Sequence, residues 1–370
     1  MFRLYILLAY VIPNIYVFFR INHLFISKGY KLWYTFIYIM LAAIYPLSRY
    51  LPDNEMSLAS QILSTVAGYL LPFYLYLFLA LLVFDLFLLF NLLFRIVSVE
   101  RRKTYSFRVY ALSALISLSV AVVIGGVINL NTIRVSEYQI TLPKQNSNIG
   151  KLRVAFVSDI HIEKSLSLRF LEQFVRKVNA LQPDILLYGG DIVEGDSEHE
   201  TSEAMESLLR KIQTKYGVFG VVGNHEFYGG QEQGVFFSKA QITLLNDSII
   251  NIDNAFYLAG RYDQHFRNRK TIEEILQNNA ADLPIILMDH RPTQIQEVSR
   301  TAVNVQFSGH THNGQLFPIN FIIRRMYELS WGYKKIGDTH FFVSSGLRLW
   351  GPPVKTAGKS EIMVVDFTFE

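Results

Sequence analysis

The 370-residue sequence predicts a mixed α/β domain preceded by an all-α transmembrane domain of about four helices. Two observations lead to this prediction. Hydrophobic residues make up 51% of the chain, and residues 1–130 concentrate them in long stretches with almost no charge. Residues 150–370 have the mixed composition of a globular domain large enough to bury its own core, and short apolar segments there each run into polar residues. We therefore expect a transmembrane helical domain over 1–130 and a globular domain over 131–370.

The transmembrane prediction rests on four apolar stretches, at 4–19, 32–47, 62–94 and 109–130. A helix that crosses the hydrocarbon core needs about 20 apolar residues. The fourth stretch meets this length, and the third exceeds it, so the third must tilt, kink near Pro72 or project from the bilayer. The first two are shorter but end in aromatic or basic residues that suit the membrane interface. A buried soluble bundle is the less favoured alternative, because its helices normally show a polar face.

Asp85 is the one charged residue of the third stretch. A carboxylate at membrane depth is costly and often functional. The alternatives are a polar contact between helices or a position near the membrane surface, and we favour these.

Loop charge predicts the orientation. Counting Lys, Arg, Asp and Glu, the loops at 20–31 and 95–108 carry +3 and +4, whereas the loop at 48–60 carries −1. Positive loops stay in the cytoplasm. With four spans, the domain at 131–370 is then expected outside the cytoplasm, in a multi-pass membrane protein.

The composition also limits the partners. The chain has no cysteine, so any metal must be bound by His, Asp, Glu or Asn side chains. The formal net charge of +4 is mild and is typical of cytoplasmic anchoring loops, so nucleic acid is not an expected partner. Membrane lipids are expected partners. The oligomeric state is not predicted.

In the globular domain, residues 133–142 alternate loosely, as in an edge strand, and 168–181 form an amphipathic helix with apolar residues three and four apart. Five buried strands are predicted, in KLRVAFVSDIH (151–161), PDILLYGGDIVEGD (183–196), YGVFGVVGNHEFYGG (216–230), LPIILMDHRP (283–292) and AVNVQFSGHTHNGQ (302–315).

Each of these strands delivers polar residues to its C-terminal tip, where the sites of α/β folds collect. Five of the nine histidines of the chain lie at these tips. The tip residues are Asp159, His161, Asp191, Asn224, His225, His290, His310 and His312. We expect them to converge in space.

This mixture of nitrogen and oxygen donors without sulfur suits two divalent ions, first manganese, with iron, zinc or magnesium as alternatives. Two ions about 3.5–4 Å apart can clamp the attacking and leaving oxygens of a phosphoryl displacement. In an extended segment His310 and His312 would point the same way. Gly309 and Gly314 would let the backbone approach closely.

The motifs Asp159-x-His161, Gly190-Asp191-x-x-Glu194, Gly223-Asn224-His225-Glu226, His290 and Gly309-His310-x-His312, in this order, resemble the calcineurin-like metallophosphoesterase superfamily over roughly 135–370. GQLFP at 314–318 and the later VSSGLRLWGPP segment resemble its membrane-associated bacterial branch, which includes membrane-bound UDP-2,3-diacylglucosamine pyrophosphatases. The resemblance implies a four-layer αββα sandwich with two metals between the sheet edges.

The resemblance also implies roles for the tip residues. Asp159, His161 and His312 would hold one metal, Asn224, His290 and His310 the other, and Asp191 would bridge both. His225 would be catalytic rather than a ligand, and would stabilise the phosphoryl oxygens or protonate the leaving oxygen.

Other residues have two interpretations each. Glu163, Glu194 and Glu226 could orient histidines or be exposed loop carboxylates. Arg291, Arg348 and Lys355 could contact a substrate phosphate, although surface charge is the favoured explanation. Residues 317–335 could lie on the membrane interface or form a buried element. No role is assigned to His23, His199, His265 or His340.

The sequence thus predicts a membrane-anchored, metal-dependent phosphoesterase. A lipid-linked phosphoester or pyrophosphate would explain the anchor, and by analogy UDP-2,3-diacylglucosamine, cleaved to UMP and a lipid monophosphate in lipid A synthesis, is the first candidate. The alternative is an extracytoplasmic phosphodiesterase or phosphatase acting on phospholipid or an envelope polymer. A non-enzymatic scaffold is less favoured because no ligand position is lost, and four helices with one acid give a transporter little support.

Overall fold

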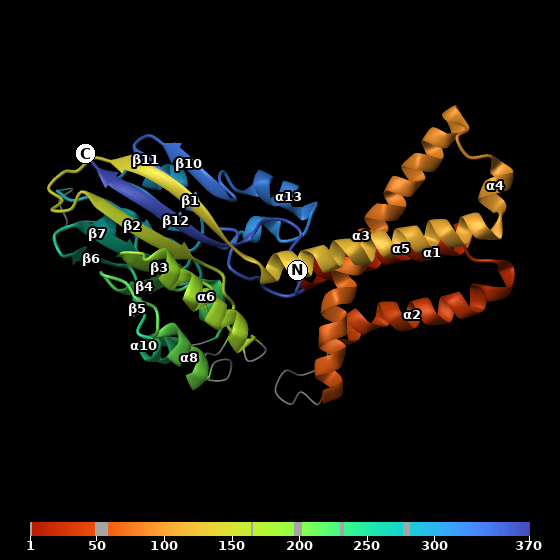
Figure 1. Cartoon of the computed structure of the whole chain (residues 1–370), viewed down its shortest axis with the longest axis horizontal. Coiled ribbons are helices and arrows are strands. Elements are labelled where there is room, and N and C mark those ends of the chain that lie inside the picture. The colour runs from red at the N-terminus through yellow and green to blue at the C-terminus, as the bar shows by residue number, and fades with distance from the viewer. Residues whose placement is uncertain (1, 49–57, 164–165, 196–201, 230–232, 277–281) are drawn as a thin grey trace. The chain divides into compact units, whose positions relative to one another are not determined.

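The computed structural model describes residues 2–48, 58–163, 166–195, 202–229, 233–276 and 282–370 (Figure 1). The chain forms two compact units. The helical unit is Met1–Ile128 with Gly351–Thr356, and the α/β unit is Asn129–Trp350 with Ala357–Glu370. The sequence predicts a change of domain after residue 130. His199 and the middle of the loop at 48–60 lie outside the described residues.

All four apolar stretches are helical. The helices of the helical unit are α1 (Phe2–Leu24), the short turn η1 (Lys28–Tyr30), α2 (Lys31–Ser48), α3 (Leu58–Phe94), α4 (Val99–Lys103) and α5 (Tyr105–Asn131). Among the described residues, two helices, α3 and α5, are long and apolar enough to cross a membrane. The prediction of four spans is therefore not confirmed.

Asp85 joins two of these helices. The Nε of Arg20 on α1 donates to both carboxylate oxygens of Asp85 on α3, each at 2.8 Å, and the Tyr16 hydroxyl donates to the same group. Pairing of this kind offsets the cost of placing a charge among apolar side chains. The interpretation of Asp85 as a contact between helices is the one that the structure supports.

The segment Gly351–Thr356 packs within the helical unit. The backbone N–H of Lys355 donates to the Gly126 carbonyl of α5 at 3.2 Å. A Cβ on Gly126 would lie 2.5 Å from Cγ1 of Val354, so only glycine allows this approach. Lys355 is 0% exposed. Its interpretation as surface charge is wrong.

The α/β unit contains two six-stranded sheets. The first sheet has, in spatial order, β1 (Ile133–Leu142), β12 (Ser360–Phe369), β2 (Lys151–Val157), β3 (Ile185–Gly189), β4 (Val218–Val221) and β5 (Thr243–Leu244). β1 and β12 are parallel, β12 and β2 are antiparallel, and β2 to β5 are parallel (Figure 1). As predicted, 133–142 is an edge strand.

The second sheet has, in spatial order, β10 (Gly332–Ile336), β11 (Thr339–Val343), β9 (Val305–Ser308), β8 (Ile285–Met288), β7 (Phe256–Gly260) and β6 (Ser248–Ile252). β11, β9, β8 and β7 are parallel, and the two outer strands are antiparallel to their neighbours. The five predicted buried strands are thus confirmed as β2, β3, β4, β8 and β9.

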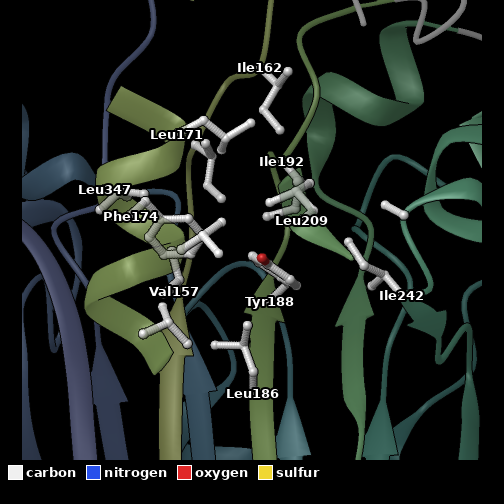
Figure 2. Packing of buried hydrophobic residues seen from close by; sticks show 14 of the residues in the cluster. Val157, Ile162, Leu171, Phe174, Leu186, Tyr188, Ile192, Leu209, Ile242 and Leu347 are labelled. Atoms are coloured by element: carbon white, nitrogen blue, oxygen red, sulfur yellow. The ribbon is translucent and has the colours of Figure 1, made fainter. Parts of the chain in front are cut away.

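Helices cover the outer faces of the two sheets. On the first sheet lie α6 (Leu168–Leu181), α8 (Glu203–Leu209) and α10 (Gln233–Lys239), and on the second α11 (Ile272–Leu276) and α12 (Ile295–Val298). The helix predicted at 168–181 is α6. Figure 2 shows Leu171 and Phe174 of α6 among the side chains of Val157, Leu186 and Tyr188 from the first sheet.

A further apolar layer fills the space between the sheets. Phe156 of β2 stacks on Phe307 of β9, with ring centroids 5.0 Å apart. Residues of both sheets are fully buried in this layer. The order helices, sheet, sheet, helices is the predicted four-layer sandwich.

Candidate metal centre

The parallel strands bring the predicted site residues together. Because β2, β3 and β4 run parallel, their C-terminal tips share one edge of the first sheet. The tips of β8 and β9 do the same in the second sheet. Three sets of ligand atoms, each within 4.8 Å of one another, result: Asp159, His161 and His312; His161, Asp191 and His225; and Asp191, His290 and His310. The sequence prediction of convergence is confirmed for these residues.

The backbone at these positions is strained. Asp159, His161, Asp191, His310 and His312 all have φ between 48° and 70°. Residues other than glycine rarely adopt this left-handed backbone region, and those that do are often found at functional sites. The loops therefore hold the donor atoms in place at a conformational cost.

The expectation that His310 and His312 point the same way from an extended segment is wrong. His310 joins Asp191 and His290, whereas His312 begins the turn η3 (His312–Gly314) and joins a different set. The left-handed backbone turns the two side chains apart. The role of Gly309 is as expected, since a Cβ there would collide with the side chains of Ser158 and Asp159.

Asp191 belongs to two of the three sets. Its Oδ1 accepts a hydrogen bond from the backbone N–H of His225 at 2.9 Å. Burial opposes the charged form of this carboxylate, but His290 and the other histidines outweigh it and hold the pKa of Asp191 well below its usual range. Asp191 is thus an anion placed between the other donors.

His290 carries an arrangement that calls for a cation. Its Nδ1 lies 2.8 Å from the Gly189 carbonyl, which can only accept, so Nδ1 must carry the proton. Its Nε2 then directs a lone pair at Oδ2 of Asp191, 3.2 Å away. Two acceptors at this distance repel unless a proton or a metal ion lies between them. Without a metal, burial lowers the pKa of His290, but Asp191 and nearby carboxylates raise it to about 10.

Other donor atoms fit bound cations as well. Nε2 of His161 and Nε2 of His312 lie 3.4 Å apart. The Oδ1 of Asn224 is buried and has no hydrogen-bond partner among the residues that the structure describes. Burial, and then His290, lower the pKa of His310 to about 3, so its ring stays neutral, which is the form that binds metals. The residues present fit bound divalent ions.

Glu194 orients two of the histidines. Its Oε2 lies 2.7 Å from Nδ1 of His161, and its Oε1 lies 2.7 Å from Nδ1 of His225. Burial opposes ionisation, but these hydrogen bonds lower the pKa of Glu194 to about 2. A carboxylate on Nδ1 fixes the tautomer and leaves Nε2 available to a metal or substrate. Of the two interpretations, orientation of histidines is the one that applies.

Replacing Glu194 by Gln is therefore expected to lower metal affinity or hydrolysis by about 10–100-fold. A glutamine accepts at one end only, so either His161 or His225 loses its partner. Metal content and the rate as a function of Mn²⁺ concentration would measure the effect. Glu172→Gln, on the exposed face of α6, is the matched control. Equal metal content and rate in both variants would mean that Glu194 does not position these rings.

His225 has surroundings that suit contact with a substrate. Its side chain is 13% exposed, as is that of His312, against 3% for His161. Burial lowers its pKa, but the hydrogen bond to Glu194 and the charge of Asp191 raise the pKa above the ordinary value. The rings of Tyr228 and Trp350 lie 5.8 and 6.0 Å from it. A ring whose pKa is raised and that is partly open to solvent fits a group that meets substrate.

The sequence does not reveal one polar cluster beside the centre. Nε of Arg291 donates to Oδ2 of the fully buried Asp263 at 2.7 Å, and His265 lies 2.7 Å from the other oxygen. Asp263 follows β7, a strand that carries no recognisable motif. Arg291 is thus held beside His290 by an ion pair rather than being a simple surface charge. Arg348 lies with its guanidinium 4.8 Å from the Phe170 ring centroid.

Comparisons with known proteins agree with this geometry. Residues 152–314 match the family described as calcineurin-like phosphoesterase. An uncharacterized metallophosphoesterase of Helicobacter pylori is 32% identical over 219 residues, which cover 57% of this chain and 58% of that relative. This chain thus spans little more than half the length of that relative.

Two further relatives concern the helical part of the chain. The match to the first extends beyond the α/β unit, and the second is named as a transmembrane protein. An uncharacterized metallophosphoesterase of Campylobacter jejuni is 27% identical over 381 residues, which cover 99% of this chain and 97% of the relative. A Bos taurus protein named as a transmembrane protein with metallophosphoesterase domain is 27% identical over 248 residues, which cover 62% of this chain and 55% of that protein.

Proposed function

Residues 152–314 belong to the calcineurin-like phosphoesterase family, which implies a metal-dependent phosphoester hydrolase, and from this premise we propose that the chain is a membrane-anchored phosphoesterase that cleaves a lipid-linked phosphoester or pyrophosphate. The proposal rests mainly on Asp191, which belongs to two of the three sets of candidate metal ligands. In this proposal 1–130 is the membrane domain and 131–370 the catalytic domain.

We propose for the residues the roles that the resemblance implies, and the contacts of the site support them. One ion would be held by Asp159, His161 and His312. The other would be held by Asn224, His290 and His310. Asp191 would bind both ions. When bound, two divalent ions polarise the phosphoryl group and offset its developing charge. When protonated, His225 would donate to a phosphoryl oxygen or to the leaving oxygen, and Glu194 would keep its ring in place.

The path of the chain supports a substrate that lies in the membrane. Helix α5 ends at Asn131 and β1 begins at Ile133. β1 is parallel to β12, and β12 is antiparallel to β2, so β1 runs antiparallel to β2. Ile133 is therefore at the edge of the sheet where β2 ends and the site lies. If α5 spans the bilayer, the site edge is the one joined to the span.

The first candidate substrate is UDP-2,3-diacylglucosamine, which would yield UMP and a lipid monophosphate. Loop charge predicts that the domain at 131–370 lies outside the cytoplasm, whereas a UDP-linked substrate is cytoplasmic. The predicted orientation therefore favours the alternative, an extracytoplasmic enzyme that acts on phospholipid or an envelope polymer. We propose the bacterial inner membrane as the location in either case.

The test compares detergent-purified full-length protein with its Asp191→Asn variant, each with Mn²⁺. UMP release from UDP-2,3-diacylglucosamine and cleavage of an aryl phosphodiester are followed in parallel. We expect wild-type protein alone to release UMP.

Cleavage of the aryl diester without UMP release would reject the first substrate and favour the extracytoplasmic alternative. Turnover of neither substrate by metal-loaded wild-type protein would reject the proposed hydrolase class for these bonds.

A further inference from the structure

We propose that one short helix of the α/β unit is a lipid-binding surface that inserts into the interface of an anionic bilayer beside the metal centre. The helix is α13 (Ile319–Met326). The "α13 surface" is defined here as Phe317, Ile319, Phe321, Ile322, Arg324, Arg325 and Met326. The inference deepens the proposed function, on which it rests for the membrane anchor, by naming the surface that would meet the lipid.

The α13 surface is apolar and exposed. Phe321 is 55% exposed, Ile322 60% and Met326 67%. Large apolar side chains are normally scattered singly over a protein surface, and a cluster of them marks an interaction site. The buried residue of this helix is polar Asn320, so α13 turns apolar side chains outward.

The charge of the surface indicates which partner covers it. Arg324 and Arg325 are exposed in its last turn, and residues 317–327 contain no acidic residue. Glu328, the next carboxylate, is occupied by Lys334 at 2.9 Å. Aromatic and aliphatic side chains flanked by arginines are typical of helices that lie in the membrane interface and attract anionic lipids.

The size of the surface argues against a second protein. A stable protein interface buries roughly 800 Å² on each partner. Half-exposed side chains of this size offer about 100 Å² each. The five apolar residues of the α13 surface fall short of that requirement, whereas interfacial binding by a chain that the proposed membrane domain already anchors needs no such area.

Both ends of α13 are tied to the metal-site histidines. At its start, a Cβ on Gly314 would lie 2.7 Å from the backbone of Asn320, so the turn that begins at His312 packs directly on the helix. At its end, the ring of Tyr327 lies 6.2 Å from that of His310. The α13 surface is therefore held beside the centre, and insertion there would present the site to phosphoesters at headgroup depth.

The absence of cysteine in the sequence makes a direct test possible. Ile322→Cys in the full-length chain is labelled with bimane and reconstituted into vesicles of phosphatidylcholine, with or without phosphatidylglycerol. Quenching by lipids brominated on the acyl chain reports contact with the bilayer, and quenching by iodide reports contact with water. Val235→Cys on α10, exposed and apolar in the same unit, is the matched control site.

We expect brominated lipid to quench the label at Ile322 at least about twofold more than the label at Val235, and more strongly with phosphatidylglycerol. Arg324→Gln with Arg325→Gln should remove the dependence on anionic lipid. The inference would be overturned if iodide quenched the label at Ile322 as strongly as the label at Val235. It would also be overturned if neither agent quenched the label at Ile322, because that result indicates a contact with protein.

This outcome is separable from that of the proposed function. Asp191→Asn should leave the quenching at Ile322 unchanged while it removes hydrolysis. An active enzyme whose label at Ile322 stays in water would refute the α13 surface alone, and a quenched label on protein that hydrolyses no phosphoester would refute the activity alone.

Discussion

Asn in place of Asp191 is expected to remove bound metal and hydrolysis together, with a loss of rate well above a hundredfold. Residues that merely orient metal ligands cost about 10–100-fold when replaced, and Asp191 is a candidate ligand in two of the three sets. The amide keeps the size of the side chain but removes its charge. It would also point a neutral group at Nε2 of His290, which now faces a carboxylate oxygen at 3.2 Å.

Metal content of the purified variant and its rate on either substrate would measure this effect. Asp366→Asn is the matched control, because Asp366 pairs with Arg153 in a partly exposed position on β12. It should keep both metal and rate. An Asp191→Asn protein with two equivalents of metal and an unchanged rate would contradict the assignment of Asp191 as the shared ligand.

Ala in place of Glu226 is expected to destabilise the α/β unit by about 3–5 kcal/mol, because several buried backbone donors lose their acceptor. Glu226 is 0% exposed. Its two oxygens accept four backbone hydrogen bonds, from the N–H groups of Asp191, Ile192, Val193 and Gly223. Removing the carboxylate would leave these donors buried without partners, at about 1–3 kcal/mol each when water cannot enter.

The melting temperature of the α/β unit, with metal removed by chelator, would report the loss. A unit of this size shifts by about 2–4 °C per kcal/mol, so a decrease of about 10 °C is expected. Trp331 and Trp350 of this unit provide the fluorescence signal.

Gln in place of Glu226 should give an intermediate decrease, since one end still accepts from Ile192 and Val193. Glu172→Ala, on the exposed face of α6, should leave the melting temperature unchanged. A melting temperature for Glu226→Ala within about 2 °C of wild type would show that water replaces the carboxylate.

The candidate site was predictable because each ligand lies within a few residues of a strand end. Asp159 follows β2 by two residues, and His310 follows β9 by two. A short apolar run that ends in polar residues is a local signal, and parallel pairing then brings such tips to one edge. The left-handed backbone of His310 and His312 was not predictable from the local pattern. The backbone N–H of His310 donates to Asp159, which lies 151 residues away in the sequence.

The rest of the fold depends on pairing over long distances. β12 (360–369) lies between β1 and β2, so strands separated by more than 200 residues become neighbours. Asp263 shows the same limit, since a single acidic residue after β7 becomes notable only when the fold brings Arg291 to it. The Asp85 contact was one of two open interpretations until α1 supplied Arg20.

The six residues Gly351–Thr356 have a consequence for anyone who divides the gene. A fragment that starts at residue 131 keeps this segment but loses its packing partners, among them Gly68, which approaches Pro353, and Tyr76, whose hydroxyl contacts Thr356. Such a fragment would expose Val354 to water and favour aggregation. A soluble version needs two edits, one before β1 and a short polar bridge from Trp350 to Ala357. For the same reason, recombination that grafts this phosphoesterase onto another anchor must exchange two separate stretches of sequence at once.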